Sequence, residues 1–88
     1  MHPAQIRAAR GLLDWSQSQL AEAAGVSLST VKDFEAGRRQ PVPNNLAAIR
    51  AALEDSGVEF IPENGGGAGV RLRAADHLDM TSGRQAQK

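Results

Sequence analysis

The chain has 88 residues, which limits it to one domain with a core too small for a deep substrate pocket. Its formal net charge is zero and its sequence pI is near 6.7, which disfavours nonspecific nucleic-acid binders, because these rely on an excess of lysine and arginine. The absence of cysteine excludes disulfides, thiolate metal sites and thiol catalysis. No apolar run approaches membrane-spanning length, and Met1-His2-Pro3 lacks the charged and apolar regions of a signal peptide, so we expect a soluble cytoplasmic protein with no membrane partner.

The first predicted helix begins at Pro3 or Ala4 and runs to about Leu13. Proline is favoured at the first position of a helix because its missing N–H would be unpaired there in any case. Ile6, Ala9 and Leu13 recur at helical spacing, so we expect this stripe to face the core.

Residues 16–37 predict two short helices joined by a tight turn. Ser16 can cap the first of them, and Gln19, three residues later, can complete a capping box. Gly25 suits the left-handed conformation that ends this helix, and Ser27 can cap the second. The complete spacing is typical of a helix-turn-helix.

The second helix of this pair has two faces and is expected to end near Gly37. Val31 and Phe34 are three residues apart on one face and are expected to pack inward. The side chains on the other face, which we expect to enter a major groove of DNA, are Leu28, Ser29 and Lys32.

The segment from Ile6 to Arg39 resembles the Cro/repressor-type helix-turn-helix of the xenobiotic-response-element family, which has the lambda-repressor-like fold. The matching positions are Ile6-Arg7, Arg10, Trp15-Ser16-Gln17, Leu20-Ala21, Gly25-Val26-Ser27, Val31, Phe34-Glu35 and Gly37, closed by Pro41. The resemblance extends to the predicted fourth helix.

The resemblance implies roles for individual residues. Gln17 would grip a phosphate, Leu28, Ser29 and Lys32 would be candidate base readers, and Thr30, Arg38 and Arg39 would contact the DNA backbone. Leu28 stands where a polar reader is common, so it offers only apolar contact, for instance to a thymine methyl group. Asp33 must point away from phosphate or lower the affinity. The resemblance also implies an ion pair between Arg10 and Glu35, for which two solvated surface charges are the alternative.

A fourth helix is predicted from Pro43 or Asn44 to Ser56, with Gly57 as its stop. Its apolar stripe consists of Leu46, Ile49 and Leu53. Several alanines raise its helix propensity and permit close packing.

Residues 58–61 and 70–73 alternate apolar and polar side chains around a glycine-rich gap, which predicts a β-hairpin. One face would carry Val58 and Phe60 against Val70 and Leu72, and the other Glu59 opposite Arg71 or Arg73. Two strands alone are marginal in water. The hairpin must therefore either cover the chain's own core or act as a dimerisation element through an exposed edge.

The expected fold class is mainly α, a lambda-repressor-like bundle of about four helices with a helix-turn-helix, followed by a C-terminal β-hairpin. Residues 1–57 would form the DNA-binding domain, residues 58–73 the hairpin, and residues 74–88 a flexible or weakly helical tail.

The predicted function is sequence-specific binding of double-stranded DNA by a homodimer that reads a two-fold symmetric operator and regulates transcription as repressor or activator. RNA polymerase and a partner protein are further candidate partners. The alternative is an antitoxin-like module that binds a partner protein and uses DNA binding for autoregulation.

We expect no enzymatic activity, because no nucleophile, base and orienting group can be assembled from these residues. No cofactor or metal is expected either. The glycine-rich run at 65–69 lacks the lysine and hydroxyl residue of a P-loop, and His77 between Asp76 and Asp79 is more typical of solvated surface.

Overall fold

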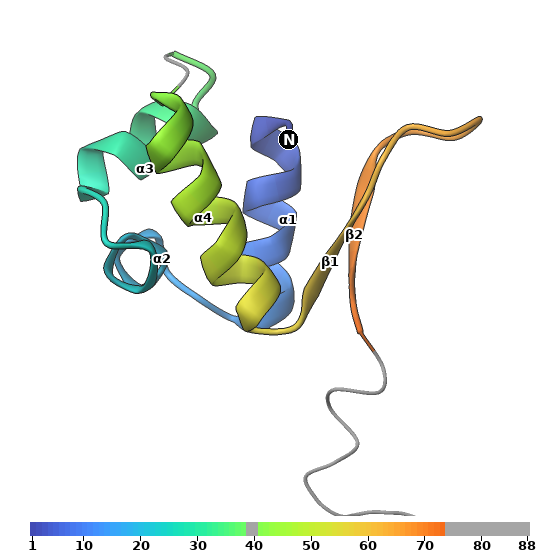
Figure 1. Cartoon of the computed structure of the whole chain (residues 1–88), viewed down its shortest axis with the longest axis horizontal. Helices are drawn as coiled ribbons and strands as arrows, with labels where there is room; N and C mark the ends of the chain where they lie inside the picture. The colour runs from blue at the N-terminus through green and yellow to red at the C-terminus, as the bar shows by residue number, and fades with distance from the viewer. Residues whose placement is uncertain (39–40, 74–88) are drawn as a thin grey trace, which may run out of the picture.

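The structure, a computed structural model, describes residues 1–38 and 41–73. Its elements in chain order are α1 (Pro3–Leu13), α2 (Gln17–Ala24), α3 (Leu28–Glu35), α4 (Pro43–Asp55), β1 (Val58–Ile61) and β2 (Gly69–Leu72). The helices form a bundle, and the hairpin extends from the side opposite α2 and α3 (Figure 1). This confirms the expected mainly α class with its C-terminal hairpin. The predicted tail, residues 74–88, lies outside the described residues.

Short-range hydrogen bonds define where α2 begins and ends. The Ser16 hydroxyl accepts the Gln19 N–H at 3.0 Å, and the Gln19 side chain accepts the Ser16 N–H at 2.7 Å. Gly25, with φ of 70°, ends the helix in the left-handed conformation. The predicted capping box and glycine stop are therefore both confirmed.

The ends of α1 and α3 differ in detail from the prediction. Asp14 ends α1 with φ of 58°, a conformation that aspartate tolerates better than most residues other than glycine. The last helical residue of α3 is Glu35, and Ala36 keeps a right-handed backbone before Gly37 turns at φ of 74°. The helix thus ends slightly earlier than Gly37 suggested.

The core lies where all four helices meet the start of β1. Its largest fully buried side chains are Phe34, Ile6, Leu20, Ile49, Leu53, Val31 and Val58. Leu13, expected to complete the inward stripe of α1, is only half-buried, whereas Gln5 is buried. Gln5 can be buried because its amide donates to the Gly69 carbonyl at 3.0 Å and accepts the His2 N–H at 2.7 Å.

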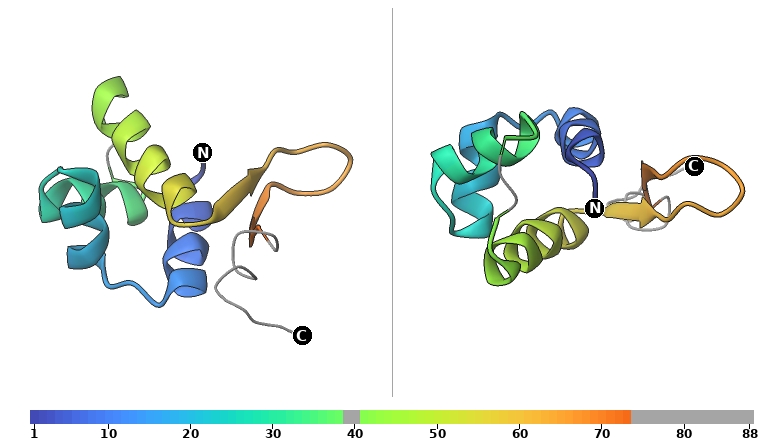
Figure 2. Two further views of the ribbon diagram at one scale, coloured as in Figure 1. Left: turned by 60° about the horizontal axis from the view of Figure 1, so that its bottom comes forward. Right: turned by 90° about the horizontal axis from the view of Figure 1, so that it is seen from above.

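The predicted hairpin is present, and its register places Glu59 opposite Arg71, one of the two partners expected for it, and Phe60 opposite Val70. β2 begins and ends one residue earlier than the predicted strand at 70–73. The Arg71 guanidinium donates to the Glu59 carboxylate at 3.0 Å. Arg73, the other predicted partner of Glu59, instead donates to the Glu54 carbonyl at 2.6 Å. Seen from above, the hairpin lies beside α1 and α4, with α2 and α3 on the far side (Figure 2).

Candidate nucleic-acid interface

The two faces of α3 are separated as the helical spacing predicts. Val31 and Phe34 are 0% and 2% exposed and pack into the core. Leu28 is 36% exposed, and Ser29 and Lys32 are also exposed. These three side chains lie within one helical turn on the outward face of α3, so a single surface can contact all of them.

The beginning of α3 carries a cluster of hydroxyl groups. The Ser27 hydroxyl accepts the Thr30 N–H at 3.1 Å and lies 2.8 Å from the Thr30 hydroxyl. The Ser29 hydroxyl lies 3.2 Å from that of Ser27. The cap therefore orients all three side chains at the positive end of the helix dipole, where an anion is favoured. Thr30, a predicted backbone contact, would share its hydroxyl between Ser27 and a phosphate.

Glu35 joins α3 to α1 through a buried ion pair. Its carboxylate is 3% exposed and accepts two hydrogen bonds from Arg10, from Nε at 2.7 Å and Nη2 at 2.8 Å. Arg10 also donates to the Trp15 carbonyl at 2.9 Å. The hydrogen bond to Glu35 raises the pKa of Arg10 above its ordinary value. The pair implied by the resemblance is thus confirmed, against the alternative of two solvated charges.

Gln17 belongs to the same network. Its Nε2 donates to Glu35 Oε1 at 3.1 Å, and its side chain is half-buried in the first turn of α2. An amide nitrogen carries two hydrogens, so one remains for another acceptor such as a phosphate oxygen. Glu35 therefore holds in place the residue predicted to grip the phosphate.

Arg7, one of the positions that carry the resemblance, is a further member of this network, and the sequence predicted no contact for it. Its guanidinium, on the exposed side of α1, donates to the backbone carbonyl of Glu35 at the end of α3. A cation at the carbonyl end of a helix is favourable. The available signal was the position of Arg7 three residues before Arg10, which places both cations toward one side of α1.

The remaining residues predicted to contact DNA differ in whether their side chains already have a partner within the protein. Arg38 forms an ion pair with Asp33 at 3.3 Å, with side chains 67% and 37% exposed. Pairs this exposed contribute about 0–1 kcal/mol, so a phosphate can replace Asp33 as the partner of Arg38. The Lys32 side chain makes no hydrogen bond or ion pair with any residue in 1–38 or 41–73. Arg39 lies outside the described residues.

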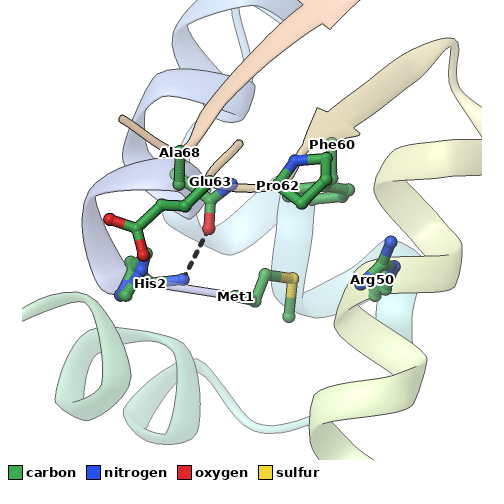
Figure 3. Close-up of a pocket in the computed structure, with 8 residues that line it drawn as sticks. Met1, His2, Arg50, Phe60, Pro62, Glu63 and Ala68 are labelled. Carbon is green, nitrogen blue, oxygen red and sulfur yellow. Dashed lines mark hydrogen bonds between the residues drawn. The ribbon is translucent and has the colours of Figure 1, made fainter. Parts of the chain in front are cut away.

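A pocket of 280 Å³ lies under the hairpin, lined by Met1, His2, Gln5, Arg50, Phe60, Pro62, Glu63 and Ala68 (Figure 3). The guanidinium of Arg50 lies 5.0 Å from the centre of the Phe60 ring and binds Glu54 at 2.9 Å. None of these lining residues comes from α2 or α3, so the pocket is separate from the outward face of α3. Within the described parts of the chain, no three His, Cys, Asp or Glu residues are grouped to hold a metal ion.

Comparison with known proteins agrees with this geometry. Residues 6–58 match the model of a family described as helix-turn-helix. No curated protein matches the chain. In residues 1–38 and 41–73, no helix has both the length and the apolar character required to cross a membrane. The match begins within α1 and ends at the first residue of β1, so it includes the buried Glu35 network and the exposed face of α3. The chain therefore belongs to the helix-turn-helix family of DNA-binding transcription regulators.

Proposed function

We propose that this protein binds a specific, two-fold symmetric DNA operator as a homodimer and regulates transcription from it. The observation that carries the proposal is the outward face of α3, where Leu28, Ser29 and Lys32 are exposed on a helix whose other face is buried. A helix of this kind fits the major groove, in which all four base pairs present different groups.

Both ends of α3 are fixed, which favours specific contacts with bases over nonspecific electrostatic binding to the DNA backbone. The Ser27 cap holds its first turn, and Glu35, bound by Arg10, holds its last. Side chains on such a helix approach the bases with little freedom to lose on binding. Specific contacts can therefore give affinity although the chain has a formal net charge of zero.

The proposed contacts divide into two groups. Lys32 would donate to guanine O6 or N7, and Leu28 would contact a thymine methyl group. Ser29 would hydrogen-bond a base edge, since its hydroxyl can both donate and accept. The contacts with the DNA backbone, which set the register on the duplex without reading sequence, would come from Gln17, Thr30, Arg38 and Arg39.

The first experiment is the selection of genomic DNA fragments by the purified protein at near-physiological salt. At this ionic strength, nonspecific electrostatic binding is weak. We expect one enriched motif with two-fold symmetry and half-sites one helical turn, about 34 Å, apart. A pool without any enriched motif would contradict sequence-specific recognition.

The second experiment compares two variants that each remove one positive charge. Lys32→Ala should reduce discrimination between the selected motif and random DNA by about 1–3 kcal/mol and change the preferred base at one position. Arg50→Ala, on the exposed side of α4, is the matched control and should leave discrimination unchanged. Equal losses on specific and random DNA for Lys32→Ala would refute its role as a base reader.

A further inference from the structure

The two strands of the hairpin direct their backbone groups alternately toward each other and outward. The Arg73 N–H donates to the Gly57 carbonyl at 2.8 Å, so this pair belongs to the shared ladder. Opposed residues of an antiparallel pair alternate between those that exchange hydrogen bonds and those that do not. The residues whose N–H and C=O groups point out of the hairpin are therefore Val58 and Phe60 on β1, and Val70 and Leu72 on β2.

The outer edge of β1 is closed to another strand. Val58 is fully buried, and its carbonyl accepts a hydrogen bond from the Arg73 guanidinium at 3.4 Å. The next outward position after Phe60 is Pro62, which has no N–H to donate.

α1 packs against β2 as α4 packs against β1, and the outer edge of β2 is open in its backbone hydrogen bonds. In residues 1–38 and 41–73, no hydrogen bond from another segment reaches the backbone of Val70 or Leu72. An edge strand with unpaired backbone groups is a template for a further strand, and a two-stranded hairpin gains stability from one.

We propose that β2 pairs with β2 of a second copy of this chain, antiparallel, so that the two hairpins form one four-stranded sheet about a two-fold axis between the two Val70 residues. Val70 would exchange two hydrogen bonds with Val70 of the second copy, and Leu72 would pair with Ala68 of the second copy. The inference rests on the homodimer of the proposed function and specifies its surface and register.

Charge selects this register. Only two registers that match the outward backbone groups bring three residues of each β2 strand opposite three of the other, one centred on Val70 and one on Arg71. Centring on Arg71 places two guanidinium groups directly opposite each other, which is destabilising. Centring on Val70 places Arg71 opposite Gly69, which has no side chain.

The apolar face supports the same register. Phe60 and Val70 are opposed in the hairpin, half-buried, and packed against the core on one face of the sheet. The Val70-centred register continues this row into Val70 and Phe60 of the second copy. Facing β-branched and aromatic side chains stabilise neighbouring strands. The hairpin projects away from α3, so the outward face of α3 stays free (Figure 1).

Two variants at Gly69 test the surface with opposite charges at one position. A side chain there has room, because its Cβ would meet only Ile61 Cδ1, at 4.0 Å, and Gly69 has no left-handed φ. Gly69→Glu should tighten the dimer and Gly69→Lys should weaken it, each by about 2- to 30-fold in the dissociation constant, since two symmetric pairs with Arg71 are affected. Sedimentation equilibrium measures these constants.

The register is tested on the unmodified chain by isotope-filtered NMR of a mixture of labelled and unlabelled protein. We expect an intermolecular contact between the Hα atoms of Gly69 and Arg71, which lie opposite each other without exchanging hydrogen bonds. A contact between the two Arg71 Hα atoms would overturn the register. Equal dissociation constants for the two Gly69 variants, or a monomer at every concentration, would overturn the surface.

These outcomes are separable from those for DNA recognition. If the chain is monomeric but still selects a half-site in a Lys32-dependent way, the β2 surface is refuted and base reading by α3 stands. If the NMR contact and the Gly69 charge effect are found but no DNA motif is enriched, the β2 surface stands and the proposed function falls.

Discussion

Replacing Glu35 by glutamine tests whether the buried ion pair holds α1, α2 and α3 together. Glu35→Gln keeps the shape of the side chain but removes the charge that accepts both Arg10 hydrogen bonds and that of Gln17. Breaking one partner of a buried pair costs about 3–5 kcal/mol. Arg10 is 20% exposed and keeps its bond to the Trp15 carbonyl. We therefore expect a smaller loss, about 2–3 kcal/mol in the free energy of unfolding.

Thermal and urea denaturation at one fixed protein concentration measure this loss. For a domain of this size the expected loss corresponds to a decrease of about 10–20 °C in Tm. The matched control is Glu54→Gln, which breaks the pair between Arg50 and Glu54, whose side chains are 49% and 40% exposed respectively. That change should cost no more than about 0.5 kcal/mol.

A double replacement separates the charge from the packing. Arg10→Met with Glu35→Leu removes both charges and leaves apolar side chains of similar volume, so it should recover most of the stability lost in Glu35→Gln. A loss in Glu35→Gln no larger than that in Glu54→Gln would refute the reasoning, because the pair would then behave as a surface pair.

Three further predictions concern caps and charge. Gly25→Ala should lower the free energy of unfolding by about 1 kcal/mol, because Gly25 has a left-handed backbone with φ of 70°. Gly11→Ala should instead raise the free energy of unfolding by about 0.5–1 kcal/mol, because Gly11 lies in the helical conformation of α1 with open space around it. Ser16→Ala should cost about 1 kcal/mol through loss of the α2 cap, measured by urea denaturation against Ser16→Gly, which should cost less. The hydrogen bond from Arg71 lowers the pKa of Glu59 below its ordinary value of 4.5. The contribution of this pair to the stability of the fold is therefore complete above pH 4.5 and is lost as the pH falls through the lowered pKa. An NMR titration midpoint for Glu59 at or above 4.5 would contradict this.

Features set by residues close in sequence were predictable. The capping box of Ser16 and Gln19 joins positions three apart, and Gly25 has the backbone freedom that its turn requires. The alternation of apolar and polar residues placed Glu59 on the same face of the hairpin as Arg71 and Arg73, because side chains of a strand point to opposite faces in turn. The register of the structure then selects Arg71 as its partner. These elements follow from local geometry and need no knowledge of distant contacts.

The tertiary structure decided which side chains share one environment. The resemblance implied the contact of Glu35 with Arg10, 25 positions away, but not the one with Gln17, 18 positions away. Gln5 is buried because its amide meets Gly69, 64 positions away. Periodicity identifies the faces of a helix but not which residue of another element lies against them, since that depends on how the elements pack. By itself, the sequence determined the helices, the caps at Ser16 and Ser27, the stop at Gly25, the hairpin and the outward face of α3. The packing of the helices and hairpin decided how α3 is held and which strand edge remains open.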